Sequence, residues 1–330
     1  MVLGIKGDIL RIKFFSIASL YFFIFVSLIM GLVMGTAKDR QAYIKHFESP
    51  FEDNRIEIGF QYYMYGFELL NIPPQLSIII TCVLTYGILS RVWLRYVNVH
   101  WVASLLIFNF FMFSLLNYYL GTSIRMGLAM AISLYSSYKY MDGKKFYLAP
   151  LVGAFVLHYG ALLYILVFLW FIFTKNLSVK FHIVMSAIGG LLLVLFFDLV
   201  LPSIGLSSYY MAYFETDFGR TERLLPFTVL FSIAAIWLTF LYSSKSKLHE
   251  TSEILIVSLY SLPFIIYFLY SGNPLFGKML MPIIFLQSII VTNLYFRPVL
   301  VLLGGPLLIS ILLLLNALAI IYALKMYQYI

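Results

Sequence analysis

Two residues that can bind or transfer charge interrupt apolar stretches of this sequence. Arg125 lies in the first turn of a helix predicted over Ser123–Tyr140, and His158 lies within the apolar run Phe146–Phe173. A guanidinium beside the backbone N–H groups of a helix N-terminus is suited to binding phosphate. A neutral imidazole can accept a proton near physiological pH. The sequence therefore predicts phosphate binding by Arg125 and general-base chemistry by His158.

Each of these two residues also has a structural interpretation. Arg125 would then be an interfacial arginine whose guanidinium extends to water. His158 would be a polar group that is hydrogen-bonded to a neighbouring helix. Ionisable side chains within membrane spans are costly, so those that occur there are candidates for function. We favour the functional interpretation for Arg125, and both interpretations of His158 stay open.

Further polar and aromatic candidates lie in two long intervals between apolar runs and at the start of a later run. The interval Gly35–Gln75 contains more acidic than basic residues, and the interval Pro202–Leu224 is rich in tyrosine. A solvated loop is the structural alternative for both. The candidate ligands of a sugar or phosphate are Asp39, Arg40, Tyr43, Glu57 and Tyr62 in the first interval, Arg220 and Arg223 in the second, and Lys278 at the start of a span.

The elements that must position these residues are membrane helices. The chain is 62% hydrophobic and 11% charged, with a mean hydropathy of +0.96, far from the averages of soluble proteins. Apolar runs of the roughly 20 residues that a helix needs to cross a membrane recur along the whole length. We predict an all-α, polytopic integral membrane protein with about 9–11 transmembrane helices. Residues 1–330 form a single membrane domain in this prediction.

The distribution of charge orders these helices. Lysines and arginines in the short loops place the basic N-terminus inside, and the intervals Gly35–Gln75 and Pro202–Leu224 on the outer side. Within the first interval, Glu57–Leu70 mixes tyrosine, phenylalanine and leucine with few charges, which is typical of a helix in the membrane interface. We expect Pro73 and Pro74 to end that helix.

The run Phe146–Phe173 is predicted to be a short hairpin rather than one span. A single crossing would place Lys175 and Lys180 outside, against the charge rule, although later charges make the margin modest. A turn near His158–Gly160 would stop short of the far surface. Non-helical backbone at that depth is tolerated where it lines a cavity, so we expect His158 to face a buried outer cavity.

Composition also excludes several classes of function. The net charge of +8 is spread over short loops, so we expect no nucleic-acid partner. The one cysteine, Cys82, lies in an apolar run and allows neither an intrachain disulfide nor a cysteine metal cluster. The sequence has no glycine-rich nucleotide loop, no His-Glu-x-x-His helix and no Gly-x-Ser-x-Gly elbow. We therefore expect no metal and no cofactor.

Four short segments resemble the bacterial O-antigen and exopolysaccharide polymerases of the Wzy and EpsG type. They occur in this order between Asp39 and His158. Met126 departs from the resemblance, since glutamine is common there. The matching segments are Asp39–Tyr43 (DRQAY), Glu57–Phe60 (EIGF), Ile124–Arg125 followed by Gly127 and Ala129, and Phe155–His158 (FVLH).

The resemblance implies an inverting, metal-independent glycosyltransferase on the periplasmic face of the bacterial inner membrane. A growing glycan would leave undecaprenyl diphosphate and join the next lipid-linked repeat unit of an O-antigen, as in lipopolysaccharide, or of an exopolysaccharide. Membrane lipid and a separate chain-length regulator are candidate partners. A flippase or transporter of lipid-linked oligosaccharides, an O-antigen-ligase-like enzyme and a membrane acyltransferase are the alternatives.

The candidate residues can support the reaction that the resemblance implies. His158 would be the base that deprotonates the attacking hydroxyl, with Glu57 and Asp39 as substitutes. Tyr43 and Tyr62 would contact the sugars. The cations available to the diphosphate are Arg125, Arg40, Arg220, Arg223 and Lys278.

Overall fold

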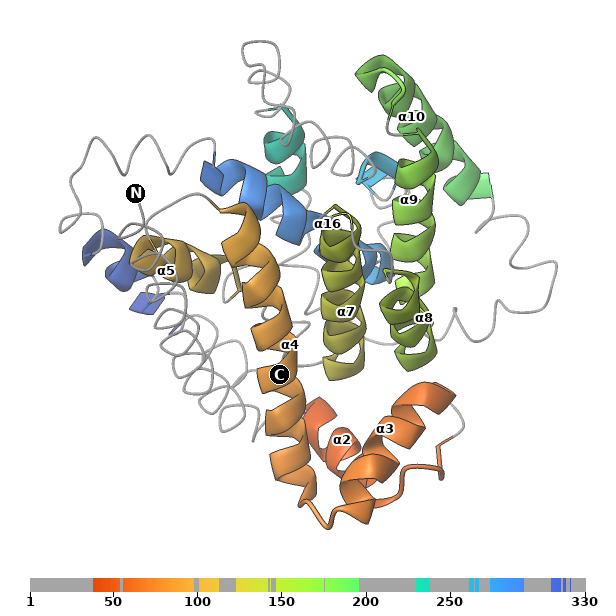
Figure 1. Cartoon of the computed structure of the whole chain (residues 1–330), viewed down its shortest axis with the longest axis vertical. Coiled ribbons are helices and arrows are strands. Elements are labelled where there is room, and N and C mark those ends of the chain that lie inside the picture. The colour runs from red at the N-terminus through yellow and green to blue at the C-terminus, as the bar shows by residue number, and fades with distance from the viewer. Residues whose placement is uncertain are drawn as a thin grey trace, which may run out of the picture. The chain divides into compact units, whose positions relative to one another are not determined.

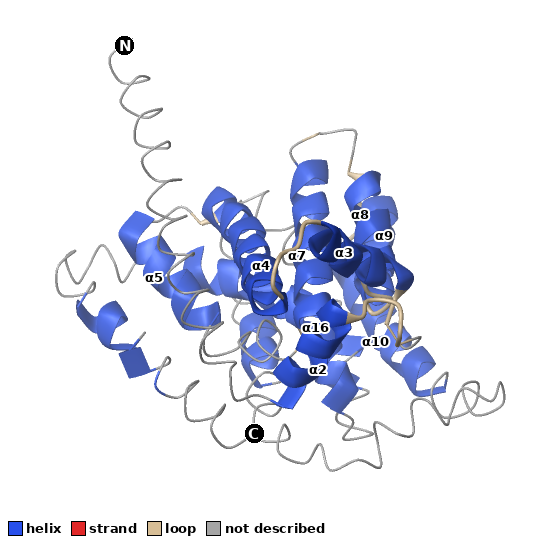
Figure 2. Cartoon of the chain, turned by 90° about the horizontal axis from the view of Figure 1, so that it is seen from below, coloured by secondary structure: helices blue, strands red, loops and turns tan. Residues whose placement is uncertain are grey.

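The computed structural model is helical, and the residues it describes contain no strand, which confirms the all-α prediction for that part of the chain (Figures 1 and 2). The chain divides into two compact units, one formed by Met1–Ala161 with Leu300–Ile330 and the other by Leu162–Val299. The predicted first helix, Phe14–Met34, and the second outer loop, Pro202–Leu224, lie outside the described residues. These are 38–53, 56–97, 101–112, 123–141, 143, 147–174, 176–195, 230–237, 261–263, 265–266, 274–293, 310–315, 317–318 and 321.

Helices α2 (Lys38–Glu48) and α3 (Ile58–Leu69) lie across one end of the first unit (Figure 1). Their apolar side chains pack against the starts of α4 (Pro74–Tyr96) and α7 (Ile124–Met141). α3 confirms the helix predicted near Glu57–Leu70, whereas α2 lies in an interval whose mixed charges indicate a loop. We call the buried residues at this contact the apolar cluster. Its members are Tyr43, Phe47, Ile56, Phe60, Met64, Ile78, Cys82 and Ile124.

The end of α3 differs from the sequence-based expectation. The helix stops at Leu69, and Asn71 takes a left-handed conformation with φ of 52°. Asparagine tolerates that conformation better than most residues do. Pro73 is then the N-cap of α4, and Pro74 is its first residue, where a missing N–H costs no helical hydrogen bond. The prolines start α4 rather than end α3.

Helix α4 packs against α7, and α7 packs against α8 (Leu148–Leu157). With 23 residues, α4 is about 35 Å long, enough to cross a hydrocarbon core of about 30 Å. Ala129, Ala131 and Ser133 of α7 are fully or almost fully buried, and such small side chains allow close approach of helices. This arrangement holds the N-terminus of α7 beside the C-terminus of α8.

Helix α8 ends at His158, as the proposed turn requires. His158 has extended backbone angles, φ −158° and ψ 115°, and its carbonyl accepts a hydrogen bond from the N–H of Ala161 (2.9 Å). Ala161 is the first residue of α9 (Ala161–Thr174). The break within the apolar run is therefore confirmed. Whether α9 returns to the inner side depends on how the two units are arranged, so the hairpin itself stays a prediction.

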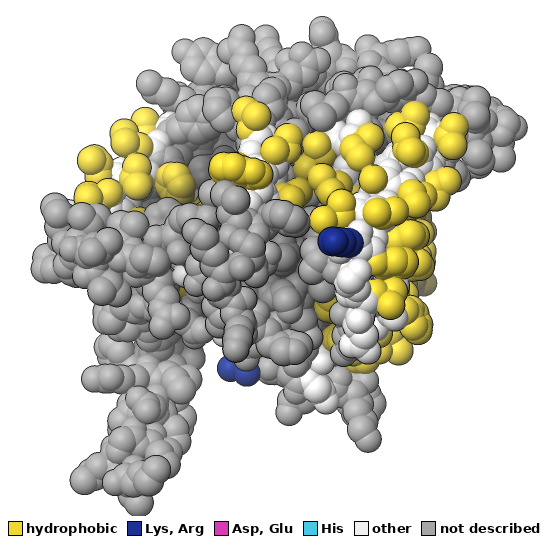
Figure 3. Space-filling model, turned by 90° about the horizontal axis from the view of Figure 1, so that it is seen from above, with side chains coloured by type: hydrophobic (Ala, Val, Ile, Leu, Met, Phe, Trp, Pro, Cys, Tyr) yellow, Lys and Arg dark blue, Asp and Glu magenta, His cyan; other side chains and the backbone are white. Residues whose placement is uncertain are grey.

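The second unit contains α10 (Val179–Leu195) and α16 (Pro274–Val291) in addition to α9. A buried polar chain crosses its interior, because Ser232 Oγ donates to Gln287 Oε1 (2.7 Å) and Gln287 Nε2 donates to Ser261 Oγ (3.3 Å). Such hydrogen bonds join apolar helices in membrane proteins. Figure 3 shows that the described side chains on the face seen from above are mainly hydrophobic, with isolated Lys and Arg.

Candidate functional site

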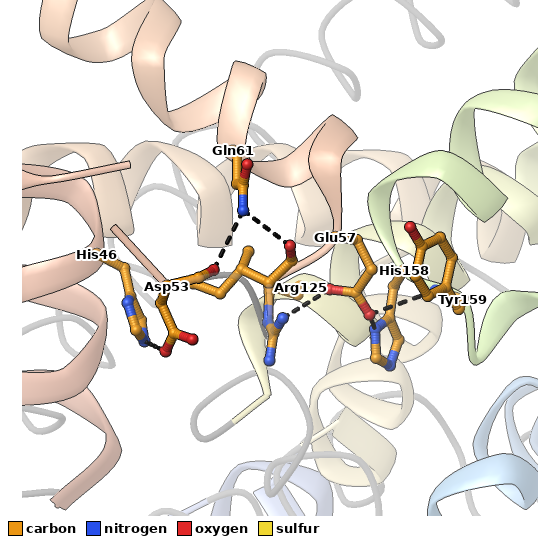
Figure 4. Close-up of polar contacts among 8 residues, drawn as sticks. His46, Asp53, Glu57, Gln61, Arg125, His158 and Tyr159 are labelled. Carbon is orange, nitrogen blue, oxygen red and sulfur yellow. Dashed lines mark hydrogen bonds and ion pairs between the residues drawn. The ribbon is translucent and has the colours of Figure 1, made fainter. Parts of the chain in front are cut away.

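The carboxylate of Glu57 points away from the helix that it precedes. Glu57 is the N-cap residue of α3, and its carbonyl accepts hydrogen bonds from the N–H groups of Phe60 (2.9 Å) and Gln61 (3.0 Å). An N-cap side chain commonly accepts a bond from the first helical turn, but the Glu57 side chain makes none there. It extends toward α7 and α8 instead (Figure 4).

Each carboxylate oxygen of Glu57 binds a different partner. Arg125 Nη1, from the first turn of α7, lies 2.6 Å from Oε2. His158 Nδ1, at the end of α8, lies 2.5 Å from Oε1, and the backbone N–H of Tyr159 donates to the same oxygen at 3.4 Å. Figure 4 shows the carboxylate between the guanidinium and the imidazole. We call Glu57, Arg125 and His158 the Glu57 cluster.

The Glu57 cluster combines one buried side chain with two that are partly exposed. The Glu57 side chain is 8% exposed, whereas those of Arg125 and His158 are 24% and 23% exposed. Burial by itself raises the pKa of Glu57, but the hydrogen bond with His158 and the charges of His158 and Arg125 lower that pKa further, to a net value below the ordinary one. The carboxylate is therefore ionised at neutral pH, while its two partners remain accessible to a ligand.

An ionised carboxylate fixes the tautomer of His158. A carboxylate only accepts hydrogen bonds, so Nδ1 of His158 carries the hydrogen that joins it to Glu57. In the neutral imidazole Nε2 is then the acceptor, and it makes no hydrogen bond within the described part of the chain. A Cβ atom added at Gly160 would lie 3.0 Å from Nε2, so glycine at that position leaves room for the ring. The arrangement orients Nε2 as a base.

A second glycine brings α3 close enough to α8 for these contacts. A Cβ atom added at Gly59 would lie 2.3 Å from Val156 Cγ1 and 2.6 Å from the Val156 carbonyl oxygen. Gly59 is two residues from Glu57, and Val156 is two residues from His158. The contact between the two helices therefore sets the distance between the carboxylate and the imidazole.

The loop before α3 is fixed by Gln61. This buried side chain donates from Nε2 to the carbonyl oxygens of Asp53 (3.1 Å) and Ile56 (3.0 Å). Asp53 also lies 3.9 Å from His46 Nε2 on α2. These contacts fix the backbone of Asp53 and Ile56 ahead of Glu57 (Figure 4).

The remaining predicted site residues lie on α2, α3 and α16 or outside the described residues. Arg40 is half-buried on α2, beside Asp39, and Tyr43 of the same helix is 7% exposed within the apolar cluster. Tyr62 of α3 is 62% exposed. Lys278 belongs to α16 in the second unit. Arg220 and Arg223 lie outside the described residues. The roles predicted for these six substrate-contacting residues and for Asp39 stay predictions.

The chemistry of the Glu57 cluster suits an anion better than a metal. It contains one carboxylate, one imidazole and one guanidinium, and the guanidinium repels a metal cation. Groups of three His, Cys, Asp or Glu side chains that could hold a metal ion are absent from the part of the chain that the structure describes.

Sequence reasoning identified all three residues of the cluster but not their connection. The sequence predicts Glu57 as a sugar contact or as a substitute for His158, whereas the structure makes it the shared partner of Arg125 and His158. The signal in the sequence is that the segments Glu57–Phe60 and Phe155–His158 both belong to the resemblance to Wzy- and EpsG-type polymerases. The backbone contribution of Tyr159 and the close approach at Gly59 carry no sequence signal of their own.

One described helix, α4, is long and apolar enough to cross a membrane, and the Glu57 cluster lies where the N-termini of α3 and α7 meet the C-terminus of α8. The chain belongs to the EpsG family, whose family model matches residues 16–330. This is a family of membrane proteins of exopolysaccharide biosynthesis. No curated protein and no solved structure matches the chain.

Membership in the EpsG family confirms part of the sequence-based expectation. The chain is a membrane protein with a role in exopolysaccharide biosynthesis. The resemblance to EpsG-type proteins is thereby confirmed. A role in O-antigen synthesis, the polymerase reaction and the orientation in the membrane stay predictions.

Proposed function

We propose that this protein is a polysaccharide polymerase that transfers a growing glycan from undecaprenyl diphosphate to the next lipid-linked repeat unit. The observation that carries the proposal is the Glu57 cluster, in which one buried carboxylate holds a cation and an imidazole side by side. A glycosyl transfer from a diphosphate needs these two groups, a cation for the leaving group and a base for the attacking hydroxyl.

In this reaction His158 is the base. Its Nε2 takes the proton from a hydroxyl of the acceptor sugar, while Glu57 on Nδ1 stabilises the imidazolium that forms. The hydroxyl oxygen attacks the anomeric carbon of the donor, and the bond from that carbon to the diphosphate breaks. The leaving diphosphate takes the electron pair. A single displacement of this kind inverts the anomeric centre.

Arg125 is the cation for the leaving group. A guanidinium has five N–H donors, so it can bind a carboxylate and a phosphate oxygen together. Its contact with Glu57 fixes the side chain in place before substrate arrives. By analogy with oxyanion donors, loss of one such preorganised group lowers the rate by about 10²–10³-fold. Arg40, which belongs to the same unit as Arg125, is proposed as a further contact of the diphosphate.

A substitute base and the orientation complete the proposal. Asp39 is the substitute base. The cluster faces the periplasm of a bacterial inner membrane, where lipid-linked repeat units are joined. A chain-length regulator is a proposed partner.

The proposal is tested by expression in a strain that lacks its own polymerase, with gel analysis of the surface polysaccharide. The wild-type chain should restore a ladder of lengths. Glu57→Gln should abolish it, whereas Glu68→Gln, an exposed carboxylate at the other end of α3, should retain it at equal membrane abundance. A single repeat that never extends, despite correct insertion, would overturn the proposal. Restored surface delivery without lengthening would instead indicate a flippase.

A further inference from the structure

Helix α3 is apolar on two opposite faces. One face lies in the apolar cluster, where Phe60 and Met64 are fully buried. The other face carries residues spaced four, three and four positions apart, which places them in one line along the helix. We call this line, together with the aromatic ring before it, the outer stripe. Its members and their exposed fractions are Phe51 44%, Ile58 48%, Tyr62 62%, Tyr65 37% and Leu69 63%.

The outer stripe is a continuous surface rather than a set of separate side chains. The ring of Phe51 packs at 5.4 Å from the rings of both Tyr62 and Tyr65. Glu68 is the only charged residue in the α3 sequence, IGFQYYMYGFEL. A helix that is apolar all round is normally covered on every side, and a contiguous exposed apolar patch marks an interaction surface.

The neighbouring helix α2 shows that this exposure is not a general property of the end layer. Its exposed residues Gln41, Lys45 and Glu48 have similar helical spacing and are polar, and the exposed residue beside them, Ala42, has only a small apolar side chain. The two helices belong to the same layer, yet one presents polar groups outward and the other presents aromatic and aliphatic groups. They therefore face different surroundings.

The occupant that fits the outer stripe is membrane lipid. The chain belongs to a membrane protein family, and α3 leads through a short turn directly into α4, the described helix able to span a membrane. α8, which contacts α3 at Gly59, carries its own exposed apolar line. Tyrosine is enriched at membrane–water interfaces, where its ring sits at the level of the headgroups. The α8 line consists of Leu148, Val152 and Val156.

We propose that the outer stripe is embedded in the interfacial layer of the membrane and holds α3 at the level of the lipid headgroups. Amphipathic interfacial helices bury their apolar face about 5–10 Å into the boundary of headgroups and acyl chains. Glu57 precedes Ile58, the first member of the stripe on α3, so the depth of the stripe sets the depth of the carboxylate. In combination with the proposed function, on which this one step rests, the Glu57 cluster lies level with the diphosphate of a lipid-linked substrate.

The test measures which medium surrounds the stripe. Cys82, the single cysteine, is 2% exposed, so a nitroxide reagent should leave the wild type unlabelled and serve as the blank. Tyr62→Cys and Leu69→Cys place labels on the stripe, where exposed side chains tolerate exchange. Lys45→Cys on α2 is the matched polar control. Each labelled protein is reconstituted in vesicles of phosphatidylethanolamine and phosphatidylglycerol, after gel filtration shows a single species.

Collision of the label with oxygen, which concentrates in lipid, is compared with collision with a water-soluble nickel complex. Labels at Tyr62 and Leu69 should relax more with oxygen than with nickel, and the label at Lys45 should show the reverse. Stronger relaxation by nickel at both stripe positions would overturn the proposal, because the stripe would face water. Exclusion of both reagents would also overturn it, because protein would then cover the stripe. The readout requires no glycosyl transfer, so it is independent of the proposed activity.

Discussion

Replacing Gly59 with alanine tests whether the spacing of α3 and α8 controls the chemistry. The added Cβ would lie 2.3 Å from Val156 Cγ1 and 2.6 Å from the Val156 carbonyl oxygen. The methyl group of Val156 can rotate away from this contact. The carbonyl oxygen cannot, because it belongs to the backbone of α8. The start of α3 must therefore move.

The size of the movement follows from these distances. Ordinary van der Waals contact begins at 3.4 Å, so the carbonyl contact requires 3.4 − 2.6 = 0.8 Å of additional separation. If Glu57 moves with Gly59, the distance from its Oε1 to His158 Nδ1 grows from 2.5 Å to about 3.3 Å, which is longer than a charge-assisted hydrogen bond. A misplacement of about 1 Å at a catalytic site lowers the rate by on the order of 10²-fold.

The assay is the rate of glycan extension in membrane vesicles supplied with lipid-linked repeat units. Gly66→Ala is the matched control, because it makes the same exchange in the same helix and its added Cβ meets nothing within 4 Å. Alanine stabilises a helix interior by about 1 kcal/mol relative to glycine, so this control should be at least as stable as the wild type. Extension by Gly59→Ala at the wild-type rate would refute the reasoning, as would an equal loss in both variants.

Three further outcomes are expected. Gly160→Ala should lower the extension rate at unchanged membrane abundance, because its Cβ would lie 3.0 Å from Nε2 of His158; a wild-type rate would show that the ring has room to move. The lowered pKa of Glu57 means that its stabilising effect is present above the ordinary pKa and is lost as pH falls through the folded-state value. The difference in Tm between the wild type and Glu57→Gln in detergent should therefore shrink below about pH 4.5, and a constant difference would count against the ion pair. Tyr63→Phe removes the hydrogen bond to Thr81 Oγ1 (2.9 Å) and should reduce the free energy of unfolding by about 1 kcal/mol, which thermal unfolding measures; an unchanged Tm would contradict that contribution.

Much of the fold is predictable because membrane helices have simple requirements. The segment Ser123–Tyr140 agrees with α7 within one residue at each end, since long apolar runs bounded by polar residues leave few alternatives. The break at His158 follows from charge placement rather than hydropathy, which is continuous there. Helix α2 is not predictable in this way, because its apolar face is short and its mean composition is polar.

The candidate site was predictable as a set of residues and not as an arrangement. Arg125 and His158 stand out because charge is rare in apolar sequence. Glu57 stands among other acidic residues in a polar interval, and nothing local distinguishes it from Glu52 or Glu68. Its distinction arises from tertiary packing, since its partners lie 68 and 101 residues further along the chain.

That separation also has a consequence for how the protein is made. At roughly 5–20 residues per second, the 101 residues between Glu57 and His158 take on the order of 5 to 20 s to synthesise. Arg125 is made after the first 68 of these residues, so until then the carboxylate has neither of its partners, and an unpaired charge is costly in lipid. The segment that carries it must wait in water until α7 and α8 have entered the membrane, so closure of the Glu57 cluster is a late event in the biogenesis of this protein.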